Sequence, residues 1–126
     1  MGILENKRLL ITGVLTDSSL AFGVAQLALA EGAEVVITGA GRGLRLTERT
    51  AKKLDGDVEV MEFDVTDPDH VSQIRNSLSE KWGNVDGALH AIGFMPEIGL
   101  GEDFLEGQWE DLSVGFEISA YSLKTI

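Results

Sequence analysis

The sequence predicts an α/β fold built on a doubly wound parallel sheet, and three observations point to it. Short apolar runs of strand length alternate with longer stretches whose apolar residues recur at helical spacing. Glycine stands at the ends of several of these segments, where the chain must turn. The chain has 126 residues, 44% of them hydrophobic, which suits one domain with its own core. Strands that alternate with helices form parallel sheets with right-handed crossovers, so we expect the strand order 3-2-1-4.

Four segments have the apolar pattern of a strand, and three have helical spacing. The expected strands cover residues 8–12, 35–38, 58–63 and 86–92. The expected helices cover residues 20–31, 44–54 and 68–81. Gly32 is a typical stop for the first helix, and a glycine cluster at Gly39–Gly43 closes the second strand. Pro68 suits the first turn of the third helix.

Beyond the fourth expected strand the pattern loses its regularity. Residues 94–110 are acidic and indicate a loop, with Trp109 as its expected anchor. Ser113 is the expected cap of a last helix. The fourth strand would have an uncovered apolar edge, which complete proteins normally cover. We therefore expect an incomplete Rossmann-like sheet, with residues 1–126 as the N-terminal part of a single nucleotide-binding domain.

Composition and charge argue against several other classes of protein. The net charge is −11, from 10 Lys and Arg against 21 Asp and Glu, whereas nonspecific nucleic-acid binding depends on basic side chains. No apolar run approaches the ~20 residues that span a bilayer. The first residues include Glu5, Lys7 and Arg8 where a signal peptide would be apolar, and the chain has no cysteine. We expect a cytoplasmic protein with neither a membrane nor a nucleic acid as partner.

The turn after the first expected strand meets the requirements of a phosphate-binding turn, although it does not match G-x-G-x-x-G. Gly13 allows a sharp backbone turn close to a pyrophosphate. Ser18 or Ser19 can cap the next helix, whose free N–H groups and positive dipole end favour an anion. The small Ala21 lets helix and strand pack closely. The alternative is an ordinary strand–turn–helix, but the place of this turn in an α/β pattern favours nucleotide binding.

Four motifs, in the same order, resemble those of one family. Gly13–Ala21 has the form G-x5-S-x-A, and MEFDV at 61–65, HAIGFMP at 90–96 and ISAYS at 118–122 follow it. Together they resemble the enoyl-acyl-carrier-protein reductases, a divergent branch of the short-chain dehydrogenase/reductase family, and in particular the mycobacterial-type enzymes. The resemblance implies an NADH-dependent reductase of fatty-acid biosynthesis. Its substrate would be a trans-2-enoyl thioester on acyl carrier protein or coenzyme A.

The resemblance also implies which residues contact the adenosine side of NADH. Four residues would line the pyrophosphate and ribose, mainly through backbone groups and the hydroxyl of the serine: Gly13, Val14, Ser19 and Leu20. Asp64 and Val65 would flank the adenine, with the Asp64 carboxylate accepting a hydrogen bond from the exocyclic amine. The alternative for Asp64 is a structural cap at the end of the third strand.

At the nicotinamide end, the resemblance implies a second group of residues. Ile92, Gly93 and Phe94 would form the floor under the nicotinamide, and Phe94 and Met95 would face the acyl substrate. The alternative for Met95 is plain core packing. The chain has Ala91 where the family usually has serine, which should weaken NADH binding without abolishing it.

The end of the second expected strand departs from the resembled pattern. The mycobacterial-type enzyme has a bulky aromatic residue followed by an acid, whereas this chain has Ala40 and Gly41. No Asp or Glu is present there to bind a free ribose 2′-hydroxyl, and Arg42 could accept a 2′-phosphate. NADH is the expected cofactor, and NADPH remains an alternative.

The histidines and the acidic loop are not expected to do chemistry. His90 lies inside the fourth expected strand and is typical of a buried core histidine, whereas His70 lies in a polar helix start at the surface. The acidic residues of the loop have no ligand-like spacing with histidine, so we expect no metal site: Glu97, Glu102, Asp103, Glu106, Glu110 and Asp111.

The family's catalytic Tyr-x6-Lys pair is not expected among these residues. The only tyrosine is Tyr121, and Lys124 follows it at the wrong spacing. By resemblance, Tyr121 belongs to the ISAYS segment, upstream of the catalytic tyrosine. We expect the chain to be an inactive fragment of a homotetrameric parent. The alternatives are a non-catalytic nucleotide-binding or interaction module, and another short-chain reductase that acts on a ketone.

Overall fold

The computed structural model describes residues 2–126, which form two compact units. The first unit ends at Ala91 and the second covers Ile92–Ile126. The first contains a four-stranded sheet in the order β3-β2-β1-β4, in which every pair of neighbours is parallel. The strands are β1 (Arg8–Ile11), β2 (Glu34–Gly39), β3 (Glu59–Glu62) and β4 (Gly87–Leu89). The predicted fold class and strand order are confirmed.

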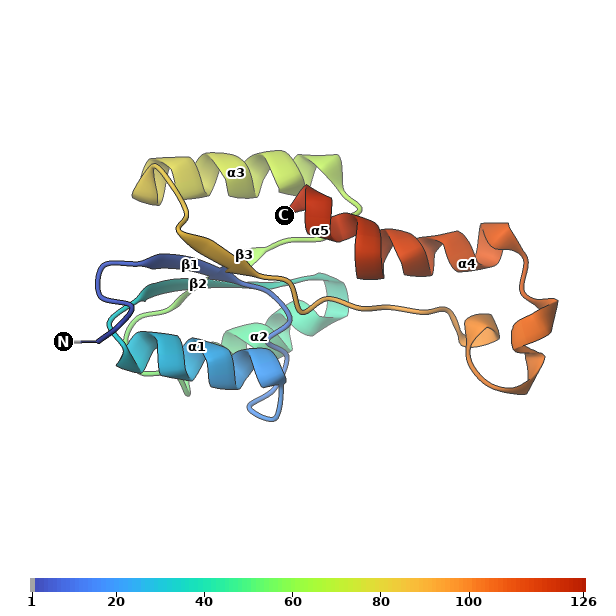
Figure 1. Cartoon of the computed structure of the whole chain (residues 1–126), viewed down its shortest axis with the longest axis horizontal. Coiled ribbons are helices and arrows are strands. Elements are labelled where there is room, and N and C mark those ends of the chain that lie inside the picture. Colours follow the sequence, from blue (N-terminus) through green and yellow to red (C-terminus); the bar gives the residue numbers. More distant parts are fainter. Residues whose placement is uncertain (1) are drawn as a thin grey trace. The chain divides into compact units, whose positions relative to one another are not determined.

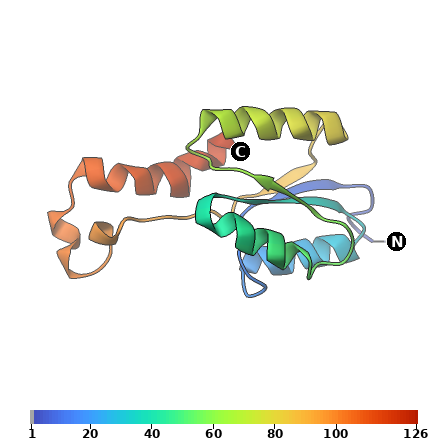
Figure 2. The ribbon, with the colours of Figure 1, turned by 180° about the vertical axis from the view of Figure 1, so that it is seen from behind.

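Three helices cover the two faces of this sheet (Figures 1 and 2). Helices α1 (Leu20–Ala30) and α2 (Leu44–Ala51) lie on one face, and α3 (Pro68–Trp82) lies on the other. The central strands are covered on both sides, so Val36 and Ile37 of β2 are fully buried. This arrangement is that of a doubly wound α/β unit.

The sequence features expected to begin and end these helices act as predicted. Gly32 has φ +92° just after α1 and donates its N–H to the Leu29 carbonyl, which is a glycine C-cap. At the start of α3, Pro68 occupies the first turn, and the Asp67 side chain accepts a hydrogen bond from Asp69 N. The buried Ala21 and Ala25 allow α1 to approach the sheet closely.

Strand β4 is shorter and more exposed than predicted. It ends at Leu89 rather than at residue 92, and the Thr12 side chain joins the chain beyond Leu89 to the end of β1. Thr12 Oγ1 donates to the Leu89 carbonyl at 2.7 Å and accepts from Ala91 N at 2.9 Å, so no backbone carbonyl of β1 pairs with that amide. The prediction that His90 lies in a buried strand is therefore wrong, since it follows β4 and is only half-buried.

The second unit is helical. Two 3₁₀ turns, Glu97–Gly99 and Glu102–Glu106, precede α4 (Trp109–Phe116), a π-helical turn (Glu117–Tyr121) and α5 (Ser122–Thr125). Ser113 was expected to cap the last helix, but the cap of α4 is Gln108, five residues earlier, which forms a reciprocal capping box with Asp111.

Trp109 does not anchor the acidic loop as predicted. Its side chain is 65% exposed, and its ring stacks on Phe116 of the same helix with centroids 5.8 Å apart.

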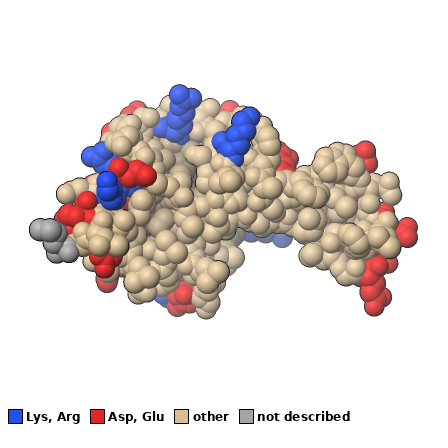
Figure 3. Space-filling model, viewed as in Figure 1, with Lys and Arg blue, Asp and Glu red and all other residues tan. Residues whose placement is uncertain are grey.

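Lysine, arginine and acidic side chains lie interspersed on the visible surface of the first unit (Figure 3). Among residues 2–126, no helix is both long and apolar enough to cross a membrane.

Candidate functional site

The turn after β1 begins with a glycine that no other residue could replace without cost. Gly13 has φ +78°, in the left-handed region that L residues rarely adopt. A Cβ at this position would also overlap the carbonyl group of Ala91, which follows β4. The predicted need for a glycine at the turn is correct. The group that comes close to it in the structure is the chain after β4, which leaves no room for a Cβ. Val14 follows and is buried in the core of the first unit.

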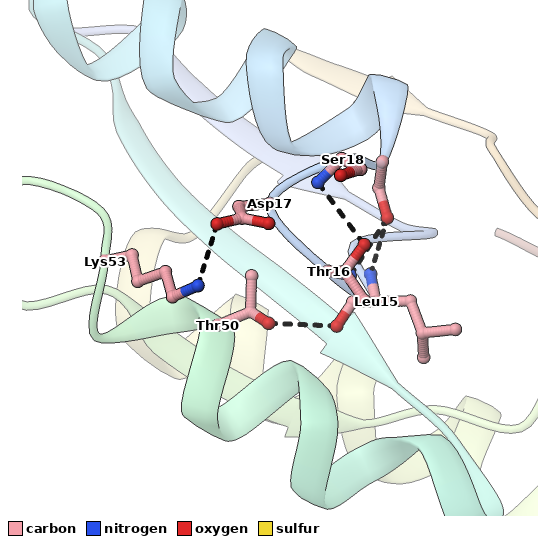
Figure 4. Close-up of polar contacts among 7 residues, drawn as sticks. Leu15, Thr16, Asp17, Ser18, Thr50 and Lys53 are labelled. Atoms are coloured by element: carbon pink, nitrogen blue, oxygen red, sulfur yellow. Dashed lines mark hydrogen bonds and ion pairs between the residues drawn. The ribbon is translucent and has the colours of Figure 1, made fainter.

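Two threonines of α2 bind the carbonyl groups of this turn, and Figure 4 shows one of them, Thr50. Thr47 Oγ1 donates to the Val14 carbonyl at 2.7 Å, and Thr50 Oγ1 donates to the Leu15 carbonyl at 2.9 Å. Both threonines are buried. Gly39 at the end of β2 leaves room for Thr47, since a Cβ there would lie 2.8 Å from the Thr47 hydroxyl.

An ion pair at the surface adds a third contact between the turn and the end of α2. Lys53 Nζ lies 2.7 Å from Asp17 Oδ2. The hydrogen bond and charge of Lys53 hold the pKa of Asp17 below its ordinary value. Because both side chains are exposed, solvent screens this pair and it contributes little stability.

Ser19 stands at the N-cap position of α1, but its hydroxyl is used elsewhere. It accepts hydrogen bonds from Leu15 N at 3.1 Å and Thr16 N at 3.0 Å, within the turn. The prediction that Ser18 or Ser19 caps the helix with its side chain is therefore wrong, because α1 has no side-chain cap. The first N–H groups of a helix have no intrahelical partner, so this positive end is open to an anion.

Leu20 is the first residue of α1 and is 91% exposed. Gly13, Val14, Ser19 and Leu20, which were predicted to contact a pyrophosphate, therefore lie in one turn at the carboxyl end of β1. Ligands of doubly wound sheets bind at this edge.

Asp64 and Val65 follow β3 at the same edge of the sheet, because all four strands are parallel. The Asp64 carboxylate accepts hydrogen bonds from the Thr66 hydroxyl at 2.7 Å and the Thr66 N–H at 2.9 Å, both at Oδ1. Asp64 thus does have the structural capping role, and within the described residues these bonds leave Oδ2 for a ligand. Val65 is half-buried.

His70 was expected to be a simple surface residue, and that expectation is wrong. Its side chain is 22% exposed, and Nδ1 accepts a hydrogen bond from Asp64 N at 3.0 Å. Nε2 lies 3.6 Å from Asp67 Oδ2. His70 therefore holds the backbone of the strand end that carries Asp64.

Asp64 should contribute a pH-dependent stability. The hydrogen bonds from the Thr66 hydroxyl and then the Thr66 N–H lower the pKa of Asp64 below its ordinary value of 3.8. Partial burial opposes them, and the charge of His70 adds a smaller lowering. The ionised form is favoured by folding, so this contribution is complete above 3.8 and is lost as the pH falls through the folded pKa. We expect the stability difference between the unaltered chain and Asp64→Asn to shrink over that range in urea unfolding. A difference that stays constant from pH 6 to pH 3 would contradict this role.

In the second unit, one hydroxyl fixes the backbone of Phe94. Ser119, in the π-helical turn, accepts from Phe94 N and donates to the Phe94 carbonyl, both at 2.9 Å. Turns of this type inside helices are frequent at functional sites. Ile92 is half-buried, and Gly93 and Phe94 are exposed, with Phe94 at 50%.

Met95 has the packing contacts of a core side chain in the second unit. A Cβ at Gly99 would lie 2.6 Å from its Sδ, and one at Gly115 would lie 2.8 Å from its Cε. Both glycines therefore make room for Met95, which favours the packing alternative over a contact with substrate.

Tyr121 and Lys124 form an exposed pair on the last turns of the second unit. Lys124 Nζ donates to the Tyr121 hydroxyl at 3.2 Å, and the tyrosine is 57% exposed.

A cluster of three or more His, Asp or Glu side chains able to hold a metal ion is not found in residues 2–126.

Three threonines of this site were missed by sequence reasoning. Thr12, Thr47 and Thr50 are buried and donate hydrogen bonds to backbone carbonyls of the first unit. The last two had a signal, since they lie three residues apart on the inner face of a helix, where β-branched polar residues are otherwise unfavourable. Thr12 had none, because the partner of a strand-end hydroxyl depends on the neighbouring strand.

Comparison with known proteins identifies the family. A protein-family model described as enoyl-(acyl carrier protein) reductase matches residues 13–126. The chain belongs to this family. The resemblance seen in the four sequence motifs is thereby confirmed, and the match begins at Gly13 and includes every residue predicted to contact cofactor.

Named reductases from several bacteria are similar to the chain over nearly its whole length. The NADH enoyl-acyl-carrier-protein reductase of Mycolicibacterium smegmatis is 42% identical over 99% of this chain and 48% of its own length. That of Neisseria meningitidis is 37% identical over 100% of this chain and 49% of its own, and that of Mycobacterium avium is 37% identical over 96% and 46%. The chain thus spans about half the length of the curated relatives it matches.

Proposed function

We propose that the chain binds NADH and serves an NADH-dependent enoyl-acyl-carrier-protein reductase of fatty-acid biosynthesis. The observation that carries this proposal is the turn after β1, whose carbonyls are bonded to α2 while the first N–H groups of α1 have no side-chain cap. Backbone N–H groups at a helix start favour a pyrophosphate. The names of the similar reductases support NADH as the nucleotide.

In this proposal the first unit holds the adenosine half of NADH. Four residues contact the pyrophosphate and ribose, chiefly through their backbone: Gly13, Val14, Ser19 and Leu20. Oδ2 of Asp64 accepts from the exocyclic amine of adenine, and Val65 packs beside the ring. The open N-terminal end of α1 supports the contacts with pyrophosphate and ribose. The contact with adenine is supported by Thr66, which binds only Oδ1 of Asp64.

The second unit would contribute the nicotinamide and acyl contacts. Ile92, Gly93 and Phe94 form the floor under the nicotinamide, and Phe94 faces the acyl group, with Met95 behind it. NADH supplies a hydride for the β-carbon of a trans-2-enoyl thioester carried by acyl carrier protein or coenzyme A. Ser119 keeps the Phe94 backbone in place during this transfer, which supports a positioning role for the π-helical turn.

We assign no catalytic residue among these 126. Tyr121 and Lys124 are three residues apart and exposed, whereas the family's catalytic pair has six intervening residues. We further propose that residues 1–126 form the N-terminal part of one NAD(P)-binding domain, in a cytoplasmic homotetramer.

The test uses the purified 126-residue chain. We expect NADH fluorescence to report saturable binding, and NADPH to bind more weakly than NADH. We expect no oxidation of NADH at 340 nm when a trans-2-enoyl thioester of coenzyme A is added. Turnover would contradict the assignment of no catalytic residue, and a chain that binds neither nucleotide would overturn the proposed function. Binding without turnover, in a longer protein as well, would favour a non-catalytic nucleotide-binding module.

A further inference from the structure

Two side chains of α2 bind a turn that lies more than 30 residues earlier in the chain, and Figure 4 shows the contact of Thr50. Thr47 binds the Val14 carbonyl over a separation of 33 residues, and Thr50 binds the Leu15 carbonyl over 35. The two threonines lie three residues apart on one face of α2, so their hydroxyls can bind two successive carbonyls of the turn. We call Thr47 and Thr50 the threonine clamp.

We propose that the threonine clamp positions the turn after β1 for a pyrophosphate, which makes Thr47 and Thr50 positioning residues for nucleotide binding. This inference rests on the proposed function. The clamp does not contact the ligand in this proposal and acts through the peptide groups of Val14 and Leu15.

The physical argument starts from the polarity of a peptide group. Its carbonyl and N–H point in opposite directions, so a bond that fixes one also fixes the other. With the Val14 and Leu15 carbonyls bonded to α2, neither can rotate towards the anion site, where a carbonyl dipole would repel a phosphate.

Ser19 completes the arrangement from the other side of the turn. Its hydroxyl accepts from Leu15 N and Thr16 N, so both polar groups of Leu15 are fixed, one by α2 and one by Ser19. The clamp therefore sets the orientation of Leu15 before a ligand arrives. Preorganisation of this kind raises affinity because the ordering cost is met on folding and not on binding.

Burial makes the clamp hydroxyls consequential. Thr47 is fully buried and Thr50 is 5% exposed, so water cannot readily replace a deleted hydroxyl. Each variant Thr47→Val and Thr50→Val keeps the shape of the side chain and removes its hydrogen bond. The turn would then keep its place in the fold but lose its fixed peptide orientation.

The experiment measures the Kd for NADH by fluorescence, at a temperature where circular dichroism shows each variant to be folded. We expect a Kd about five-fold higher for Thr50→Val and at least as large a rise for Thr47→Val, from one lost hydrogen bond each. The serine variants Thr47→Ser and Thr50→Ser, which restore a hydroxyl, should return the Kd to within about two-fold of the unaltered value.

Thr38→Val is the matched control. Thr38 is also a buried threonine of the first unit, in β2, and within residues 2–126 the threonines that bind the carbonyls of Val14 and Leu15 are Thr47 and Thr50. We expect its Kd to match that of the unaltered chain, whatever its melting temperature. If Thr47→Val does not fold, the comparison of Thr50→Val, Thr50→Ser and Thr38→Val is sufficient.

The outcomes separate this inference from the function on which it rests. Binding of NADH by the unaltered chain, with an unchanged Kd in folded Thr50→Val, overturns the clamp and leaves the proposed function intact. Lower melting temperatures without a change in Kd have the same meaning, because they indicate a purely structural role. Failure of the unaltered chain to bind NADH or NADPH overturns the proposed function and the clamp together.

Discussion

Replacing Gly13 with valine is expected to destabilise the first unit by about 4 kcal/mol and to abolish nucleotide binding. Two costs combine in this variant. The backbone at φ +78° lies in the left-handed region, which is unfavourable for any L residue and most for a β-branched one. The new Cβ would also overlap the Ala91 carbonyl, so the chain after β4 must move away from β1. Urea unfolding followed by circular dichroism measures the loss.

Gly41→Ala is the control for the first of these costs. Gly41 also has a positive φ, of +52°, but a Cβ there meets no atom within 4 Å. The Gly41→Ala variant should therefore lose only about 1 kcal/mol of its free energy of unfolding, which is the cost of backbone strain. Equal losses in Gly13→Ala and Gly41→Ala would show that the contact with Ala91 is unimportant.

Replacing Thr12 with valine is expected to cost about 2 kcal/mol, the second largest effect. The side chain is fully buried, and its hydroxyl is both the donor to the Leu89 carbonyl and the acceptor for Ala91 N. Valine keeps the packing but leaves Ala91 N without its partner. The ends of β1 and β4 should then separate more easily.

Hydrogen exchange gives this second prediction a local readout. The amide of Ala91 should exchange faster in Thr12→Val than in the unaltered chain, and should stay protected in Thr12→Ser, which keeps the hydroxyl. Unchanged exchange at Ala91 in Thr12→Val would contradict the proposed part of Thr12 in holding the two strand ends together.

Local sequence signals were sufficient for the sheet but not for the contacts of its turns. Strand order follows from alternation, and Gly32 and Pro68 determine helix ends through their own backbone preferences. Ser19 shows where such reasoning stops. Its type and position predict a helix cap, but Leu15 N and Thr16 N, brought close by the turn, use its hydroxyl instead.

The same limit applies to contacts between residues only a few positions apart. His70 lies in the first turns of α3, and its sequence neighbours gave no reason to expect a hydrogen bond with the Asp64 backbone. Trp109 was expected to anchor a loop, whereas the capping box at Gln108 begins a helix in which its ring stacks on Phe116. Both errors concern short-range contacts, whose geometry depends on how the segment folds and not on the pattern of apolar residues.

The hydrogen bonds from α2 to Val14 and Leu15 have a consequence for protein engineering. A β1–α1 segment grafted into another scaffold would carry the glycine turn but leave behind the donors that orient it. The smallest transferable module is therefore β1-α1-β2-α2, ending after Ala51. During folding, too, the turn cannot mature until a loop of more than 30 residues has closed, which places the assembly of this site after docking of the second helix.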